Sequence, residues 1–518
     1  MSRSLLKSTG IVSLMTLVSR LLGFVRDVLQ AALFGAGAGM DAFFVAFRIP
    51  NLFRRMFAEG AFSQAFVPVL GQTREQASEE EVKDLVDVVA GTLGGFLLIL
   101  TAIAVIGAPA LMWLFAPGFA DTPEKFALGV EMLRWTFPYL LLISLVAFAG
   151  GILNTYGRFA VPAFTPVWLN VCLIGAALWY SPSVLALAIA VFVAGVVQLL
   201  FQVPALLRIG MMPRPRWAWS DPRVKRIIKM MLPIMFGSSI AQISLMLDSI
   251  IASFLPADGS VSWLWYADRL MEFPLGIFSI AIATVILPGL SRHFALRSED
   301  GFSATIDWAI RMVLIVGLPA ALGLFLLAGP LVSTLFQHQA FTADDVHMTA
   351  WALNAYAIGF LGFSLVKILV PGYYARQETR TPVRAGVIAL SCSMALSLSI
   401  VGVLLWLDFV APHAGIALST ALGAWINAGI LFAGLWRGGI YRPQPGWGRF
   451  LRILLLGNGA MVVWLLWGRG ALPQWTQASW DARVLDLGLL IGVAVLLYGL
   501  TTVAAGLRPR DLRAAAQS

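Results

Sequence analysis

The sequence is poor in the residues that catalytic and metal sites use most. It has 2 cysteines and 4 histidines among 518 residues, and the histidines lack the spacing of metal ligands. Cys172 and Cys392 both fall inside long apolar segments, where free cysteine behaves as a small apolar residue, so we predict no disulfide. A glycine-rich phosphate loop ending in Lys-Ser or Lys-Thr is also missing, which argues against ATP as an energy source. We therefore predict neither a cofactor nor a metal site.

Charge is scarce as well. Only 12% of the residues are charged, whereas 59% are hydrophobic and the mean hydropathy is +0.83, values that exclude an ordinary soluble protein. A helix that spans a bilayer needs about 20 mostly apolar residues, and many such runs occur here between short stretches of Pro, Gly and charge. They predict an all-α polytopic membrane protein with about fourteen transmembrane helices, near residues 8–34, 38–70, 84–114, 126–154, 160–180, 183–207, 222–255, 261–291, 302–328, 343–375, 381–407, 412–436, 447–468 and 482–507.

Basic residues are distributed unevenly between the predicted loops. With the N-terminus inside, the inner loops collect nearly all of the arginines and lysines that lie in loops, and the outer loops hold little beyond Lys125, Arg469 and Arg483. This asymmetry predicts that both termini are cytoplasmic. The first segment carries Arg3 and Lys7 and is too long and too charged for a cleavable signal, so we expect it to be retained. The net charge of +9 reflects this topology, and we predict no nucleic-acid partner.

The chain also contains an internal duplication. Similar residues recur at an offset of 220: Pro68 and Pro288, Thr122 and Thr342, and Pro162 and Pro382. The repeat predicts an N-terminal six-helix bundle at residues 1–221, a C-terminal six-helix bundle at 222–440, and two additional helices at 441–518. Two parallel bundles related by a pseudo-twofold axis are typical of alternating-access carriers, whose substrate site lies between the bundles.

Ionisable residues concentrate in the predicted first, second and eighth helices. Each such residue costs about 2.5–3.5 kcal/mol at the centre of a spanning helix, so we expect these helices to face a water-filled cavity. On the second helix, Asp41, Arg48, Arg55 and Glu59 are spaced by seven, seven and four residues, which places them on one stripe. Pro50 is expected to kink the same helix.

The arginines point to an anionic substrate. A permanently charged guanidinium with a fork of donors suits phosphate oxygens. We predict that a diphosphate is bound by Arg20, Arg26, Arg54 and Arg269. Supporting or gating roles are predicted for the other polar residues of these helices: Ser19, Asp27, Asp41, Arg48, Arg55, Glu59, Ser262, Asp268 and Glu272. The alternative is that several of these charges form simple interhelical ion pairs or snorkel to the interface.

Five motifs carry a resemblance to a known family. They are SRLLGFVRD at 19–27, DAF at 41–43, PNLFRR at 50–55, EGAFSQAFVP at 59–68 and YADRLMEFP at 266–274. Over essentially its whole length the chain resembles the MurJ family, also called MviN, of the multidrug/oligosaccharidyl-lipid/polysaccharide exporter superfamily.

The resemblance implies a transporter rather than an enzyme. It implies a flippase that moves lipid II, the undecaprenyl-diphosphate-linked disaccharide-pentapeptide of peptidoglycan synthesis, to the periplasmic leaflet of a bacterial inner membrane. It places a cationic cavity on Arg20, Arg26, Arg54 and Arg269, with Asp41, Glu59 and Glu272 in support. It further implies that the helices at 441–518 form a groove for the lipid tail. Membrane lipids and the cell-wall synthesis or division machinery are its other expected partners.

The driving force is left open by the sequence. The resemblance suggests the membrane potential or a bound sodium ion, and Asp248 in the predicted seventh helix is a candidate cation ligand. The predicted eleventh helix offers only hydroxyls and no second acidic ligand. Membrane potential, sodium and protons all stay open.

Three alternative functions remain. A flippase for another anionic lipid-linked oligosaccharide would share the same arginines. A drug exporter of the same superfamily would share the fold, but organic cations require acidic and aromatic cavities. A membrane-embedded cell-wall glycosyltransferase would need carboxylates or histidines that converge at a membrane face. Such a group occurs in one outer loop, at His338, Asp344, Asp345 and His347, and a solvated loop is the simpler interpretation.

Overall fold

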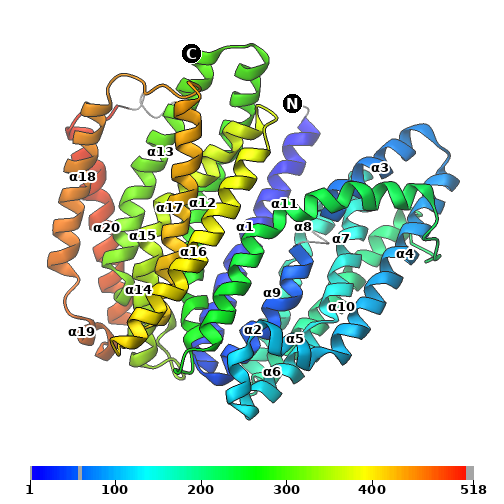
Figure 1. The fold of residues 1–518 in the computed structure, drawn as a ribbon, viewed down its shortest axis with the longest axis horizontal. Coiled ribbons are helices and arrows are strands. Elements are labelled where there is room, and N and C mark those ends of the chain that lie inside the picture. Colours follow the sequence, from blue (N-terminus) through cyan, green and yellow to red (C-terminus); the bar gives the residue numbers. More distant parts are fainter. Residues whose placement is uncertain (1–2, 56–60, 509–518) are drawn as a thin grey trace. The chain divides into compact units, whose positions relative to one another are not determined.

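The computed structural model describes residues 3–55 and 61–508, and every element in these residues is a helix (Figure 1). This confirms the predicted all-α class. The chain divides into two compact units, Met1–Ser262 and Trp263–Ser518. The first unit contains α1 (Arg3–Phe34), α2 (Ala38–Arg54), α3 (Ser63–Gln76), α4 (Glu79–Ile106), α5 (Ala108–Phe115), the short 3-10 helix η2 (Pro117–Asp121), α6 (Pro123–Thr136), α7 (Tyr139–Thr155), α8 (Ala160–Phe164), α9 (Val167–Tyr180), α10 (Leu185–Arg208), α11 (Pro222–Ser253) and the first residues of α12 (Ser260–Ala295).

The second unit contains the rest of α12 and eight further helices. They are α13 (Glu299–Leu326), α14 (Ala328–Phe336), α15 (Ala343–Tyr374), α16 (Arg380–Trp406), α17 (His413–Arg437), α18 (Trp447–Gly468), α19 (Leu472–Gln477) and α20 (Trp480–Ala504). Because the first unit includes α11, it extends beyond the limit at residue 221 that the duplication implies. The limits at residues 221 and 440 describe the sequence repeat, and they remain predictions.

Ten segments of the described residues are long and apolar enough to cross a membrane, and each coincides with a predicted span. The four predicted spans outside this set are the first, second, seventh and eighth, which correspond to α1, α2 with α3, α11 and α12. Three of these are the helices in which the sequence concentrates charge. Helices that face water instead of lipid are expected to have this composition. The total of fourteen spans remains a prediction.

Three predicted helices, the third, fourth and fifth, are each broken into two. The breaks lie beside Pro109, Pro138 and Pro166. Proline lacks the backbone N–H that a helix needs and its ring clashes with the preceding turn. Each proline therefore begins a new helix or directly precedes one.

Two other prolines that we expected to end helices lie inside them. The predicted second helix ends near residue 70, but α3 runs through Pro68 to Gln76, and α12 runs through Pro288 to Ala295. A proline kinks a helix without necessarily ending it. Residues 56–60, which include the predicted site residue Glu59, lie outside the described residues.

The helix bounds repeat along the chain at the offset found in the sequence. α4 begins at 79 and α13 at 299, and they end at 106 and 326, so both ends differ by 220. Thr122 and Thr342 are the residues that precede α6 and α15, and Thr342 caps its helix by accepting a hydrogen bond from the backbone N–H of Asp345.

Each unit has its own apolar core. In the first unit, α3, α4, α7 and α11 share a core in which the rings of Phe66 and Phe148 lie 5.0 Å apart between centroids. In the second unit, α12, α13, α15 and α17 pack together, and the Tyr373 hydroxyl donates to the Leu431 carbonyl at 2.7 Å. α18 and α20 pack on each other and contact α13 and α14. The two additional helices are thus part of the second unit.

The segment that joins α10 to α11 lies against α4. The backbone N–H of Arg216 donates to the Asp87 carbonyl at 3.0 Å. A Cβ at Gly91 would lie 2.3 Å from the Arg216 backbone, and one at Gly95 would lie 2.3 Å from the Trp217 ring. Only glycine permits this approach at both positions.

We expect Gly91→Ala to lower the free energy of unfolding by about 1–3 kcal/mol, because the linker backbone must move to admit a methyl group. Thermal unfolding of the purified protein measures the effect. Gly94→Ala is the matched control, since its Cβ would meet Leu145 at an ordinary 3.8 Å. Equal melting temperatures for the two variants would show that the linker does not depend on this contact.

Candidate functional site

Arg26 is held by fixed partners in the first unit. Its Nη2 and Nε lie 2.6 and 3.0 Å from Asp27 Oδ1, and its Nη1 donates to Asn170 Oδ1 of α9 at 3.0 Å. The Asn170 amide in turn donates to the Ser19 carbonyl at 3.0 Å. The Arg26 and Asp27 side chains are 12% and 5% exposed. Asp27 therefore orients Arg26, and Asn170 ties α9 to α1.

Two arginines of the predicted stripe on α2 face α11. Arg48 Nη1 donates to the Leu245 carbonyl at 3.2 Å and to the Ser249 hydroxyl. Arg55 Nη1 donates to Gln242 Oε1 at 3.2 Å. These hydrogen bonds connect α2 with α11 inside the first unit.

The other predicted arginines differ in their surroundings. Arg54 is half-buried and its Nε donates to Asn51 Oδ1 at 2.9 Å, one turn earlier on the same helix. Arg20 is exposed on α1. These two belong to the first unit together with Arg26, whereas Arg269 belongs to the second.

Arg269 pairs with a carboxylate of its own helix. Its Nη1 lies 2.8 Å from Glu272 Oε2, and its guanidinium carbon lies 4.5 Å from the centroid of the Trp265 ring. The Arg269 side chain is 27% exposed and that of Glu272 46%. Asp268 is half-buried on the same helix. A guanidinium stacked on an aromatic face keeps its planar fork of donors, which suits carboxylate and phosphate oxygens.

Asp41, at the start of α2, is 1% exposed and lies at the N-terminus of α12. Its Oδ1 accepts from the Ser262 backbone N–H at 2.9 Å and from the Ser262 hydroxyl at 2.7 Å. Its Oδ2 accepts from the Gly259 N–H and from Lys125 Nζ, both at 2.9 Å. A carboxylate at this position satisfies N–H groups that have no partner inside the helix and interacts favourably with the helix dipole. The structure thus brings together Asp41 and Ser262, both predicted as supporting residues.

Lys125 completes this cluster. It lies in the first turn of α6, is 8% exposed, and its Nζ is 2.8 Å from Asp258 Oδ1 as well. The Phe119 ring covers it, with the ring centroid 4.4 Å from Nζ. From the sequence, Lys125 is predicted only as a loop charge, and Asp258 is not among the predicted site residues. A lysine in the first helical turn sits at the unfavourable end of the helix dipole, and that signal could have indicated a carboxylate partner.

Asp248 of α11, the predicted cation ligand, is 8% exposed. In residues 3–55 and 61–508, no group of three or more His, Cys, Asp or Glu side chains could hold a metal ion. The role of Asp248 therefore remains a prediction.

Two of the four outer-loop residues that an enzyme would use, Asp345 and His338, have structural surroundings. Asp345 Oδ2 accepts from the Thr342 N–H and hydroxyl at 2.9 and 2.8 Å, and Asp345 Oδ1 accepts from Trp263 Nε1 at 2.8 Å. Burial, followed by the charge of Arg483, lowers the pKa of His338. These are the contacts of a helix cap and a packed loop rather than of a catalytic pair.

The comparisons with known proteins agree with the resemblance in the sequence. A family model described as "Lipid II flippase MurJ" matches residues 30–484. A probable lipid II flippase MurJ of Vibrio cholerae is 46% identical over 100% of this chain and 99% of its own length, and the lipid II flippase MurJ of Burkholderia cenocepacia is 41% identical over 94% of each chain.

Solved structures are similar as well. "Lipid II flippase MurJ, inward closed conformation" is 26% identical with a TM-score of 0.77, and the match covers 95% of this chain and 98% of that one. An inward-facing multidrug resistance transporter of the MATE family, from the multidrug/oligosaccharidyl-lipid/polysaccharide (MOP) superfamily, is 16% identical with a TM-score of 0.65. The match covers 82% of this chain and 94% of that one, and at this identity it shows a shared fold alone. The chain belongs to the MurJ family of lipid II flippases.

Proposed function

We propose that this protein flips lipid II from the cytoplasmic to the periplasmic leaflet of a bacterial inner membrane by alternating access. Family membership carries this proposal, because the family model matches residues 30–484 and the Vibrio cholerae relative aligns with 100% of the chain. The basic inner loops support an orientation with both termini in the cytoplasm.

In this proposal four arginines bind the diphosphate: Arg20, Arg26, Arg54 and Arg269. The local contacts support such a role because they fix the guanidiniums before substrate arrives. Arg26 is oriented by Asp27 and Asn170, and Arg54 by Asn51. A guanidinium carries five N–H donors in a planar fork that suits phosphate oxygens. Binding to a pre-oriented site loses less side-chain entropy.

The cluster around Asp41 acts as the outer gate in the same proposal. It joins the first turns of α2, α6 and α12, three helix ends that the predicted topology places on the outer side. Asp41 holds Lys125 and the N–H groups of Gly259 and Ser262, all of which are buried. Opening this face requires these bonds to break and water to replace them. The cluster thus favours an outwardly closed state until substrate binding offsets that loss.

Two further predictions belong to the same mechanism. The helices of residues 441–518 expose apolar side chains such as Leu455 at 71% and Val463 at 69%, which suits contact with a polyprenyl tail. Asp248 serves as the cation ligand if transport is coupled to sodium or protons rather than to the membrane potential. If the dependence of transport on sodium or proton concentration is the same in Asp248→Asn as in wild type, this role is excluded.

The test is lipid II on the outer face of cells depleted of this protein and supplied with wild type, Arg54→Ala or Arg269→Ala. We expect wild type to restore outer-face lipid II and each variant to reduce it by about tenfold or more, because each loses charge-assisted hydrogen bonds to phosphate. Arg214→Ala removes an exposed arginine of the linker between α10 and α11 and is the matched control.

The contrary outcomes are distinct. Unchanged outer-face lipid II after depletion would overturn the substrate assignment and favour another anionic lipid-linked oligosaccharide. Full rescue by both arginine variants would leave the substrate assignment in place but remove Arg54 and Arg269 from the transport path.

A further inference from the structure

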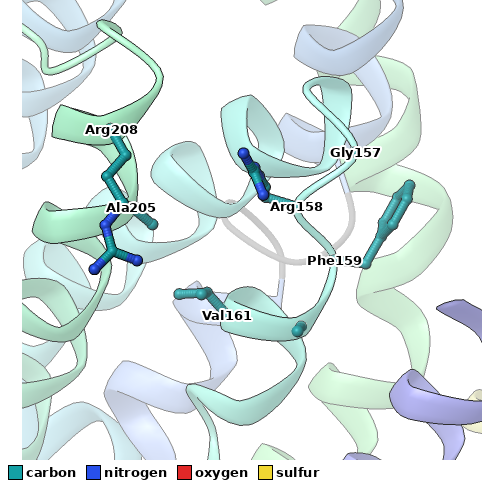
Figure 2. A pocket seen from close by; sticks show the side chains of 7 residues that line it. Gly157, Arg158, Phe159, Val161, Ala205 and Arg208 are labelled. Atoms are coloured by element: carbon teal, nitrogen blue, oxygen red, sulfur yellow. The ribbon is translucent and has the colours of Figure 1, made fainter.

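A cavity of about 430 Å³ lies in the first unit, between the turn after α7 and the last turns of α10 (Figure 2). Its lining is Gly157, Arg158, Phe159, Ala160, Val161, Ala205 and Arg208. Two of these seven residues are arginines and none is acidic. The volume falls in the range of about 300–1,000 Å³ typical of small-ligand sites.

The turn that carries Arg158 has a defined conformation. Gly157 has a φ of +73°, the left-handed conformation that glycine adopts freely, and the Arg158 N–H donates to the Leu153 carbonyl at 2.8 Å. These are the marks of a Schellman motif at the end of α7. Arg74 of α3 braces the same turn, with its guanidinium carbon 4.2 Å from the centroid of the Tyr156 ring. The position of Arg158 is therefore set by backbone geometry.

Arg208 forms the opposite wall. It is the last residue of α10, and the chain turns directly after it through Gly210, whose φ is +71°. In Figure 2 the two arginines lie on either side of the pocket, with Val161 between them. Both are exposed, and within residues 3–55 and 61–508 neither guanidinium forms an ion pair or a side-chain hydrogen bond.

The pocket lies at the level where apolar spans end. Arg208 ends one candidate span, and the turn at 156–159 joins a span that ends at Thr155 to one that begins at Ala160. Phe159 is 40% exposed, and only 28% of the span at 160–180 is buried inside the protein. The predicted topology places this level at the inner leaflet. An apolar surface therefore continues from the two arginines toward the lipid chains.

The second repeat makes the same turn with a different charge. Gln377, at 157 plus 220, has a φ of +59°, and the N–H of Glu378 donates to the Tyr373 carbonyl at 3.1 Å. Glu378 thus stands where the first repeat has Arg158, and its carboxylate accepts from the Thr381 hydroxyl. Arg437 is the last residue of α17, as Arg208 is the last residue of α10, and so carries the charge at the corresponding helix end, although the two lie 229 residues apart instead of 220.

The first repeat therefore has two cations where the second has a cation and an anion. The positive-inside rule alone does not require Arg158 and Arg208 to line one pocket, because basic residues anywhere in the inner loops satisfy it. Two guanidiniums that line one cavity repel each other, and an anion between them removes that repulsion and gains two charge-assisted hydrogen-bonding partners.

We propose that this pocket binds the phosphate group of an anionic phospholipid of the inner leaflet. Arg158 and Arg208 contact the phosphate oxygens, and the glycerol and acyl chains pass along Phe159 and Val161 into the bilayer. Basic pockets between spanning helices at the cytoplasmic face are suited to such head groups. The site is separate from the arginines assigned to the transported diphosphate, so it concerns the lipid environment of the flippase and not its substrate.

The test is a lipid titration of the full-length, delipidated protein in detergent, read by native mass spectrometry. The probes are phosphatidylglycerol, zwitterionic phosphatidylethanolamine and lipid II. We expect the double variant Arg158→Gln/Arg208→Gln to bind phosphatidylglycerol about tenfold or more weakly than wild type, because each substitution removes a charge-assisted hydrogen bond to the phosphate. Arg437→Gln removes the equivalent charge from the second repeat and is expected to leave phosphatidylglycerol binding unchanged.

Three outcomes would overturn the proposal. If Arg437→Gln weakens phosphatidylglycerol binding as much as the double variant does, the loss reflects net charge and not the pocket. Unchanged phosphatidylglycerol binding by the double variant would exclude the pocket. A double variant that keeps phosphatidylglycerol but loses lipid II would assign the pocket to the substrate. Equal melting temperatures of wild type and double variant in phosphatidylethanolamine verify that these exposed substitutions leave the fold intact.

Discussion

Asp41→Ala is expected to lower the free energy of unfolding by about 3–5 kcal/mol, because it removes one partner of a buried, hydrogen-bonded ion pair. The carboxylate is 1% exposed and accepts from Lys125, which is itself 8% exposed. Without it, the buried ammonium retains only Asp258, and the N–H groups of Gly259 and Ser262 lose their acceptor. Thermal unfolding of the purified protein in detergent measures the loss.

Asp258 provides the matched control. It binds the same ammonium at 2.8 Å, but its side chain is 61% exposed. Asp258→Ala is therefore expected to cost about 1 kcal/mol or less, as for other exposed ion pairs. A double-mutant cycle of Asp41→Ala with Lys125→Met isolates the interaction of the buried pair. We expect the double variant to lose less free energy of unfolding than the two single variants lose together. Equal losses at Asp41 and Asp258 would contradict the claim that burial makes Asp41 the stronger partner.

The helices could be located from the sequence because the signal is local. Apolar runs and their Pro, Gly and charged boundaries lie within the element they define, and the predicted span at 447–468 has the same bounds as α18. The same reasoning fails at single prolines, since whether Pro68 ends or only kinks a helix depends on the packing of the turns that follow it.

The sequence identifies charged residues of the candidate site but not the residues that they contact. Charge inside apolar segments identifies Asp41 and Arg26 as functional candidates. Their partners are distant in sequence: Lys125 is 84 residues from Asp41, and Asn170 is 144 residues from Arg26. No local pattern identifies Lys125 or Asn170 as the partner at such separations. Only the packing of α1 on α9 and of α2 on α6 makes these contacts.

A further charged pair lies outside the three charge-rich helices and is not among the predicted site residues. Asp307 and Arg311 lie one turn apart on α13, and Arg311 Nε is 2.7 Å from Asp307 Oδ2. Opposite charges at this spacing neutralise each other locally, so the helix still has the hydropathy of a membrane span. This pair anchors the segment that leads from α17 into α18.

The anchor is a set of hydrogen bonds to one carboxylate. Asp307 is 2% exposed, and its Oδ1 accepts from the Tyr441 hydroxyl at 2.9 Å, from Trp447 Nε1 at 2.8 Å and from the Gln444 N–H at 3.2 Å. Burial, followed by the hydrogen bond to Asp307, raises the pKa of Tyr441, so its hydroxyl stays protonated and able to donate. The start of α18 is thereby fixed to α13.

We expect Asp307→Ala to lower the free energy of unfolding by about 3–5 kcal/mol, because it leaves the partly buried Arg311 without its carboxylate and three donors, on the buried Tyr441 and the half-buried Gln444 and Trp447, without their acceptor. The loosened segment should also be cut faster by chymotrypsin after Tyr441, whose hydroxyl donates to Asp307 Oδ1 at 2.9 Å in the native fold. Tyr441→Phe removes one hydrogen bond from the same carboxylate and is expected to cost about 1 kcal/mol. If both variants melt alike and resist chymotrypsin as wild type does, Asp307 does not hold the additional helices in place, and apolar packing of α18 on α13 suffices.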